Sequence, residues 1–273
     1  MIKQNYHTHT SRCGHAIGSD EEYIQEALSF GLNEIGFSDH IMLPEHPQPG
    51  IRGDISLLPD YIESLESLRE KYKDKIKVFL GFEAEALPHY FPYYKQLLDE
   101  GHIQYLICGN HLEIDKENHL KWYFSKYTTA DDIKRYTKSL VKGMKTGLFV
   151  IVAHPDYFMG SYNKWDQVCI DCSRQIIRTA KKYGIWLEFN FGSLRHGKKI
   201  IGEELRFLYP VKQFWEMAKK AGVKICIGLD AHSPQDISID ANDAGYQMAL
   251  DLGLKLDQHI NVVWNRDKNC YEN

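Results

Sequence analysis

The 273-residue sequence has no long apolar run, no paired cysteine framework and no excess of positive charge. No apolar stretch approaches the roughly 20 residues that span a bilayer, and the N-terminus lacks the apolar core and cleavage site of a secretory signal. The six cysteines are scattered, and a net charge of −4 provides no overall basic field for a nucleic-acid backbone. We therefore expect a cytoplasmic protein without disulfides, membrane segments or a nucleic-acid partner.

The sequence also lacks a Gly-x-Gly-x-x-Gly motif after any strand-like segment, which disfavours a dinucleotide-binding open sheet. Short β-rich segments instead alternate with longer helical patterns. Seven strands are predicted, at 2–6, 34–38, 76–82, 103–108, 149–153, 185–190 and 223–229. Six helices are predicted, at 20–30, 60–72, 130–145, 166–183, 209–221 and 240–252. This alternation predicts parallel β-structure with helices outside, as an open doubly wound sheet or a closed barrel, in a single domain over residues 1–273.

Histidines and carboxylates fall at the C-terminal ends of the predicted strands. In a parallel barrel these ends meet on one face, where the active sites of this architecture lie. Residues i and i+2 of a strand point the same way, so His7 with His9, and Asp230 with His232, each present two donors to one side. His15 follows the first strand in a loop and can fold back over the same face. Six of the seven strands end in such donors, which are His7, His9, His40, Glu83, His111, His154, Asp230 and His232.

Seven imidazoles and two carboxylates are too many for one metal ion. A catalytic zinc takes about three protein ligands plus a water molecule, so nine donors suit three divalent ions. Imidazole and carboxylate together accept zinc, manganese or iron, and ligand type does not choose among them. A lone His-x-His pair occurs often without a metal, but unpaired buried donors at six strand ends would be costly. Asp39, Asn110 and Asp156 are neighbours of these donors and are candidates to orient them by hydrogen bonds.

The motifs resemble the full set of the polymerase and histidinol phosphatase (PHP) superfamily. They extend from residue 7 to residue 232, and all nine positions hold acceptable residue types. Within the superfamily the chain resembles the monofunctional histidinol-phosphate phosphatases, in its size, its long segment between the second and third motifs, and its stretches 149–156 and 188–195. The resemblance implies a distorted (β/α)7 TIM-like barrel with a metal site at the C-terminal ends of the strands. The motifs are His7-Thr-His9, His15, Ser-Asp-His40, Gly-Phe-Glu83, Gly-Asn-His111, Ala-His154-Pro-Asp and Asp230-Ala-His232.

The resemblance also implies how the nine donors divide among three ions. One ion would be held by His7, His9, Glu83 and Asp230. Glu83 would bridge to a second ion, which is also held by His111 and His154. The third would be held by His15, His40 and His232. With a bridging hydroxide, such a centre would be about three units positive, which suits a dianionic phosphate monoester.

The implied reaction is hydrolysis of L-histidinol phosphate to L-histidinol and phosphate in histidine biosynthesis, by attack of a metal-bound hydroxide on phosphorus. Arg195 resembles an arginine of the family that contacts the substrate phosphate, although a salt bridge within its loop is the alternative. His232, Asp156 and Glu113 are candidates to protonate the leaving group. Glu113 is also a candidate to bind substrate, together with the aromatic side chains of Trp122, Tyr123, Phe124 and Tyr157.

Other functions remain open at this point. A PHP phosphoesterase acting on another small phosphate ester or on a nucleotide 3′ end is the nearest alternative. C–N hydrolysis of the amidohydrolase type is possible on a similar barrel, but the order of the donors matches the PHP pattern better. A module that uses metals only for folding fits poorly, because structural zinc sites are normally four-coordinate and closed. The sequence does not predict the oligomeric state.

Overall fold

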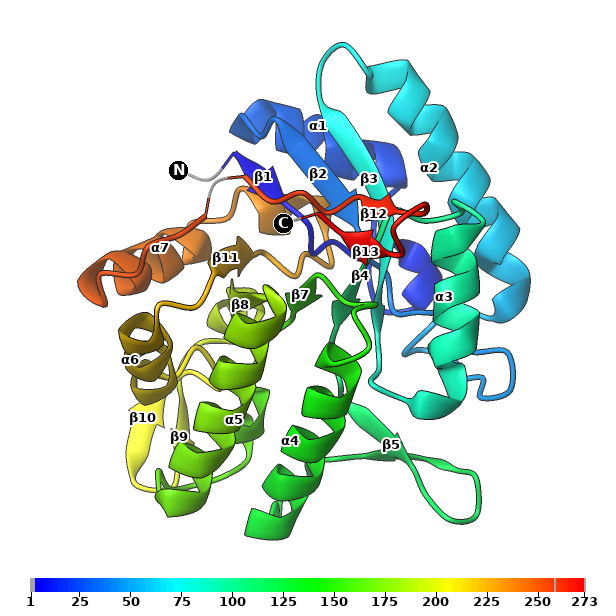
Figure 1. Cartoon of the computed structure of the whole chain (residues 1–273). Coiled ribbons are helices and arrows are strands. Elements are labelled where there is room, and N and C mark those ends of the chain that lie inside the picture. The colour runs from blue at the N-terminus through cyan, green and yellow to red at the C-terminus, as the bar shows by residue number, and fades with distance from the viewer. Residues whose placement is uncertain (1–2, 258, 273) are drawn as a thin grey trace.

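The computed structural model describes residues 3–257 and 259–272. Its centre is a seven-stranded parallel sheet in the order β1-β2-β3-β4-β7-β8-β11 (Figure 1). All seven predicted strands are present, and Ile2 of the first predicted strand lies outside the described residues. The strands span Gln4–Asn5, Glu34–Phe37, Lys77–Ala84, Tyr105–Cys108, Ile151–Val152, Trp186–Asn190 and Ile225–Gly228.

The sheet closes into a barrel where its first and last strands meet. Thr8, just after β1, forms a parallel bridge with Ala231, just after β11. The backbone N–H of His9 donates to Ala231 O at 2.8 Å, and the N–H of Ala231 donates to His7 O at 3.2 Å. The structure is therefore a (β/α)7-type barrel, as the resemblance implies, and the open-sheet alternative is wrong.

In the described part of the chain, seven α-helices pack around the barrel (Figure 1). Six of them correspond to predicted helices, and α3 was not predicted. The start of α3 is rich in proline and aromatic residues, which are weak helix formers, but proline is compatible with the first turn of a helix. The described part of the chain contains no helix that is long and apolar enough to cross a membrane. The helices are α1 Asp20–Phe30, α2 Leu58–Tyr72, α3 Phe91–Asp99, α4 Ala130–Met144, α5 Gln167–Tyr183, α6 Lys212–Ala221 and α7 Ala241–Asp251.

Three antiparallel hairpins were also not predicted. They pair β5 (Leu112–Ile114) with β6 (Leu120–Trp122), β9 (Lys199–Ile201) with β10 (Glu204–Arg206), and β12 (Trp264–Asn265) with β13 (Cys270–Tyr271). Each strand has two or three residues, which is too short for a visible alternation of apolar and polar positions. The first two hairpins lie at the end of the barrel where β3 and β4 terminate (Figure 1).

Tyr105 of β4 fills the barrel interior. Its hydroxyl donates to Tyr6 O at 2.8 Å and to Phe37 O at 3.0 Å, so it ties β4 to the ends of β1 and β2. Gly81 of β3 pairs directly with Tyr105, and a Cβ atom at Gly81 would lie 2.5 Å from Tyr105 Cε1. The glycine therefore makes room for the ring. The interior cluster contains Tyr6, Tyr105, Ile107, Val150, Ile151, Trp186, Cys226, Ile260 and Val262.

The replacement Gly81→Ala is expected to destabilise the protein by about 1–3 kcal/mol, because the added methyl group forces a buried ring from its position. Urea unfolding followed by circular dichroism would measure the loss. Gly160→Ala is the control, because a Cβ atom there would meet Leu208 Cβ at an ordinary 3.5 Å. Equal stability of the two variants would contradict this account of the barrel interior.

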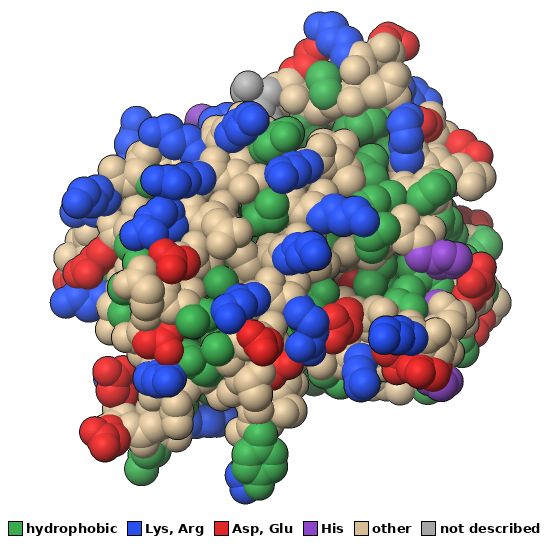
Figure 2. Space-filling model, turned by 60° about the horizontal axis from the view of Figure 1, so that its bottom comes forward, with side chains coloured by type: hydrophobic (Ala, Val, Ile, Leu, Met, Phe, Trp, Pro, Cys, Tyr) green, Lys and Arg blue, Asp and Glu red, His purple; other side chains and the backbone are tan. Residues whose placement is uncertain are grey.

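Charged side chains cover the outer helices, and Figure 2 shows Lys and Arg spread over one face with Asp and Glu among them. On α4, Arg135 contacts Glu113 at 3.0 Å and Asp132 at 2.8 Å, while Lys138 and Lys142 are exposed. Arg135 thereby holds Glu113, one of the predicted substrate-binding residues, against the outside of α4.

Candidate metal centre

A cavity of about 240 Å³ lies at the C-terminal ends of the barrel strands. Two of the nine predicted donors, His7 and His9, are buried behind it and approach Asp230 Oδ1 through Nε2 at 3.4 and 3.3 Å. The structure thus brings all nine donors to one place, from segments 225 residues apart in the chain. The other seven donors line the cavity itself, and they are His15, His40, Glu83, His111, His154, Asp230 and His232.

Unusual backbone conformations turn these side chains into the cavity. His154 and Asp230 have φ angles of 28° and 52°, and Asn110, just before His111, has a φ of 49°. Positive φ is rare for residues other than glycine, and such strain gathers at functional sites. Each of these three residues lies two residues beyond the end of a strand, so the extended chain bends there. Because of this bend, successive side chains there no longer point to alternate sides as they do within a strand.

The first donor set consists of His7, His9, Glu83 and Asp230. The two Nε2 atoms of His7 and His9 are 3.1 Å apart, and each lies 3.6 Å from Glu83 Oε2. A tetrahedral zinc ion with bonds of 2.0–2.1 Å places its ligand atoms about 3.3 Å from one another. Five of the six separations among these four side chains are 3.1 to 3.6 Å, close to this spacing. His7, His9 and Asp230 form a compact group that could hold one ion, with Glu83 beside it.

The second donor set uses the other oxygen of Glu83. Glu83 Oε1 lies 3.1 Å from His154 Nε2 and 3.7 Å from His111 Nε2. The carboxylate therefore presents one oxygen to each set. A Cβ atom at Gly109 would lie 2.4 Å from Glu83 Oε1, so the glycine leaves space for this carboxylate.

The third predicted set is only partly assembled. His15 Nε2 and His232 Nε2 face each other at 3.1 Å. His40, however, has its Nδ1 atom 3.0 Å from Glu83 Oε2, and its ring centroid is 5.4 Å from that of His15. His40 therefore lies between the third set and the bridging carboxylate.

Electrostatics in the cavity also favour cations. Burial disfavours the ionised carboxyls of Glu83 and Asp230, but the surrounding imidazoles outweigh it and hold both pKa values well below their ordinary range. Burial likewise opposes protonation of His9, but Asp230 and Asp39 raise its pKa to about 9. Burial and the charge of His9 lower the pKa of His40 to about 4. The site therefore contains two ionised carboxylates among neutral and protonated imidazoles, a donor set that fits divalent metal ions.

Carboxylates on the far side of the rings orient several of these histidines. Glu188 of β8 lies 2.9 Å from His7 Nδ1, and Glu85, directly after β3, lies 3.2 Å from His111 Nδ1. Asp39 Oδ1 is 3.5 Å from His9 Nδ1, which makes no hydrogen bond within the described residues, so the predicted orienting role of Asp39 stays a prediction. The contacts of Glu188 and Glu85 fix the ring orientation and the tautomer, so that Nε2 would face a bound metal ion.

Sequence reasoning missed the roles of Glu85 and Glu188, although the period of a strand contains a signal for the first. Glu85 lies two residues after Glu83, directly beyond the end of β3, so the strand period predicts that both side chains point the same way. Glu188 needs room that only glycine leaves, because a Cβ atom at Gly228 of β11 would lie 1.7 Å from Glu188 Oε1. This contact between neighbouring strands is not visible in the sequence.

Arg195 lies behind the cavity rather than among its lining residues. Its guanidinium donates to the carbonyl oxygens of Leu229 and Asp230, and it lies 3.4 Å from Asp236. These contacts hold the turn that carries Asp230 and His232. The predicted phosphate contact of Arg195 is not part of this arrangement and stays a prediction.

The two other candidate proton donors besides His232 do not line the cavity. Asp156 is buried, and its carboxylate accepts from Val211 N at 2.6 Å and from Trp215 Nε1 at 2.9 Å. The bond to Val211 also explains why α6 starts after residue 211 and not at residue 209, as predicted. Burial raises the pKa of its carboxyl to about 6. Asn110 donates to Tyr136 O and contacts no predicted metal donor through its side chain. Of the three candidates, only His232 lies at the cavity.

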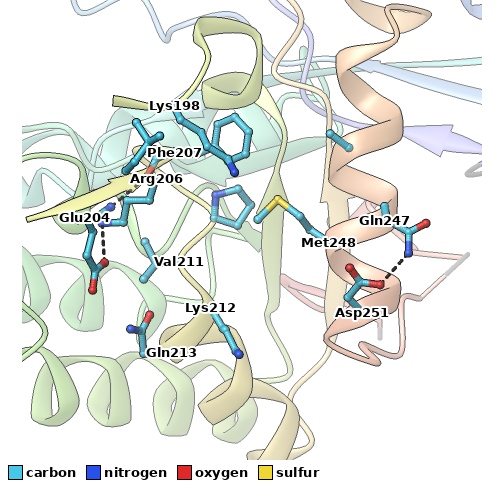
Figure 3. Close-up of a pocket in the computed structure, with 13 residues that line it drawn as sticks. Lys198, Glu204, Arg206, Phe207, Val211, Lys212, Gln213, Gln247, Met248 and Asp251 are labelled. Atoms are coloured by element: carbon cyan, nitrogen blue, oxygen red, sulfur yellow. Dashed lines mark hydrogen bonds and ion pairs between the residues drawn. The ribbon is translucent and has the colours of Figure 1, made fainter. Parts of the chain in front are cut away.

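A larger cavity, of about 560 Å³, lies between the β9–β10 hairpin, α6 and α7. Figure 3 shows its lining of Phe207, Val211 and Met248 with lysines, Arg206 and two carboxylates at the edges. It contains no histidine. It is larger than the cavity at the strand ends, but the predicted metal donors converge in the smaller cavity.

The model of the PHP domain family matches residues 5–191, which include seven of the nine donors. The chain belongs to the PHP domain family. This PHP protein is 27% identical to a "Probable histidinol-phosphatase" of Deinococcus radiodurans over 241 residues, which cover 87% of this chain and 89% of the relative. It is 29% identical over 235 residues to a "Probable phosphatase" of Thermoanaerobacter sp., covering 85% and 79% of the two chains.

A solved PHP-type structure has the same fold. The histidinol phosphate phosphatase of Lactococcus lactis, crystallised with zinc, L-histidinol and phosphate, superposes with a TM-score of 0.69 at 18% identity. The match covers 93% of this chain and 95% of that one. At this identity the likeness establishes the barrel architecture of the PHP protein.

Proposed function

We propose that the protein is a metal-dependent phosphomonoesterase that hydrolyses L-histidinol phosphate to L-histidinol and phosphate. The observation that carries the proposal is Glu83, whose two oxygens face two separate sets of imidazoles in one cavity. Family membership and relatives named as histidinol-phosphatases support the choice of substrate. The nine donors are sufficient for three divalent ions, which we propose to be zinc, manganese or iron.

Divalent ions in this cavity would lower the pKa of a coordinated water molecule and offset the charge of a phosphate group. The chain supplies the arrangement around them. Glu83 holds the two donor sets at a fixed separation, and Arg195 fixes the turn of Asp230 through its carbonyl contacts. His232 lines the cavity, but burial and the charge of His9 lower its pKa to about 2, so the group that protonates the departing alkoxide stays a prediction. Tyr157 and Tyr209 close one wall, with rings 5.3 and 5.5 Å from that of His154, and exclude water from that side.

A substrate panel tests the proposal. Phosphate release would be measured for L-histidinol phosphate, sugar phosphates, nucleotides and an aryl phosphate, with manganese or zinc added after chelation. The proposal predicts the highest metal-dependent kcat/KM for histidinol phosphate. A metal-dependent preference for another ester or for a nucleotide 3′ end would identify a PHP phosphoesterase with a different substrate. Absence of hydrolysis throughout would overturn the mechanism.

Trp122, at the end of the β5–β6 hairpin, is 47% exposed and still lines the cavity, with its ring 6.2 Å from that of His111. We expect Trp122→Ala to raise KM for histidinol phosphate about 2- to 12-fold with little change in kcat, because the indole face offers stacking worth about 0.5–1.5 kcal/mol to the substrate ring. Tyr127→Ala removes an exposed aromatic residue that does not line the cavity and is the control. A selective fall in kcat would place Trp122 in the chemistry instead.

A further inference from the structure

The segment 42–59 leaves the barrel after β2, and its residues Ile51 and Arg52 line the metal cavity. Arg52 is the only Lys or Arg among the lining residues, and its side chain is 1% exposed. A buried guanidinium is costly unless its N–H groups have acceptors. The acceptors that Arg52 uses therefore indicate its role.

Three contacts hold the Arg52 guanidinium. Nε donates to Gln48 Oε1 at 2.7 Å, and one terminal nitrogen donates to Ile41 O at 2.9 Å. The bond to Gln48 lies within the segment, and the bond to Ile41 joins the segment to the residue directly after His40. The other terminal nitrogen donates to Glu85 Oε1 at 3.2 Å, which connects the segment to the residue directly after β3.

Glu85 in turn holds His111 at two points. One carboxylate oxygen accepts from the backbone N–H groups of His111 and Leu112, and the other lies 3.2 Å from both His111 Nδ1 and Arg52. With Nδ1 held there, Nε2 of His111 faces Glu83 Oε1. Arg52, Glu85 and His111 thus form a continuous chain of contacts from the segment to a metal donor.

We propose that Arg52 is a positioning residue for His111, acting through Glu85, so that the segment 42–59 is part of the metal centre and not merely a cover over it. The inference rests on the proposed function only in assuming that His111 binds a metal. Glu83, near the end of β3, and Glu85, just after it, are buried carboxylates two residues apart. Removing the one guanidinium between the segment and β3 leaves Glu85 facing a like charge, and it loses its place against His111.

Metal binding measured without substrate tests this directly. Competition with a chromophoric chelator gives the zinc affinity, and the absorption spectrum of the cobalt-substituted protein reports ligand geometry. We expect Arg52→Met and Glu85→Gln each to lower the affinity for one of the bound ions by about 10–100-fold and to change the cobalt spectrum. The double variant should have a metal affinity no lower than that of the weaker-binding single variant, because Arg52 and Glu85 act in series on His111.

Two further variants sharpen the test. Arg52→Lys keeps the charge but lacks the planar fork that reaches three acceptors, so it should restore little of the affinity. Arg174→Met, on the outside of α5, removes an exposed arginine paired with Asp171 and should change nothing. If Arg52→Met does not fold, Glu85→Gln and Arg52→Lys carry the same comparison.

Wild-type metal affinity and an unchanged cobalt spectrum in Arg52→Met, together with a raised KM, would show that Arg52 contacts substrate and would overturn the proposal. Additive losses in the double variant would overturn the route through Glu85. Failure of the proposed function is a separate result, in which the wild-type protein does not hydrolyse histidinol phosphate although the metal affinities of the variants still differ.

Discussion

Replacement of Glu83 by glutamine is expected to lower kcat/KM for histidinol phosphate by about 10³–10⁴-fold, a transition-state loss of about 4–5.5 kcal/mol. The amide has nearly the same size as the carboxylate, but it is neutral and has only one oxygen. The amide therefore cannot present one carboxylate oxygen toward His7 and His9 and a second toward His154. Steady-state kinetics together with the metal content per chain would measure the loss.

Glu66→Gln is the control for Glu83→Gln, because Glu66 lies exposed on α2 and pairs only with Arg69. Thermal unfolding of both variants in the metal-loaded form would separate a lost ligand from a lost fold. Activity of Glu83→Gln within tenfold of the wild type would contradict the bridging role. Full metal content with no activity would restrict Glu83 to a role in the reaction itself.

Removal of the ions by a chelator is expected to abolish phosphate release and to lower the melting temperature by an amount on the order of 10 °C. An ion present at a thousandfold above its Kd contributes about 4 kcal/mol, and 1 kcal/mol shifts Tm by about 2–4 °C in a chain of 150–250 residues. Without the ions, buried imidazoles and carboxylates face one another across 3.1–3.7 Å. Phosphate-release assays and calorimetry of the same samples would measure both effects.

Chelator that has been saturated with zinc before its addition is the control, because it adds the same solute without withdrawing metal. Added zinc or manganese should restore activity and melting temperature together. A protein proven metal-free by elemental analysis that still hydrolysed the substrate would contradict the metal centre. Recovery of stability without activity would indicate that the restored ion is not the one that functions in the reaction.

The barrel and the predicted metal donors could both be predicted from the sequence, and for the same reason. Strands alternating with helices imply a parallel barrel, and the parallel barrel brings all strand ends to one face. Spacing of two residues then places His7 beside His9, which the structure shows with their Nε2 atoms 3.1 Å apart. These inferences need only local periodicity and the direction of the strands.

Contacts made by loops and by neighbouring strands could not be predicted in this way. Arg195 bonds to carbonyl oxygens, which every residue carries, so no sequence pattern identifies its partners. His40 was expected beside His15 but lies nearer Glu83, because the position of a side chain beyond a strand end depends on how the chain bends there. Helix α3 and Arg52 depend likewise on packing between distant segments.

The bridge between Thr8 and Ala231 joins the two ends of the barrel at the point where His7, His9 and Asp230 meet. During translation, His7 and His9 leave the ribosome more than 200 residues before Asp230. At about 5–20 residues per second, that interval is on the order of 10–45 seconds. The nascent chain therefore presents free imidazoles to the metal pool of the cell well before it can bind an ion correctly, and correct loading has to await the completed polypeptide.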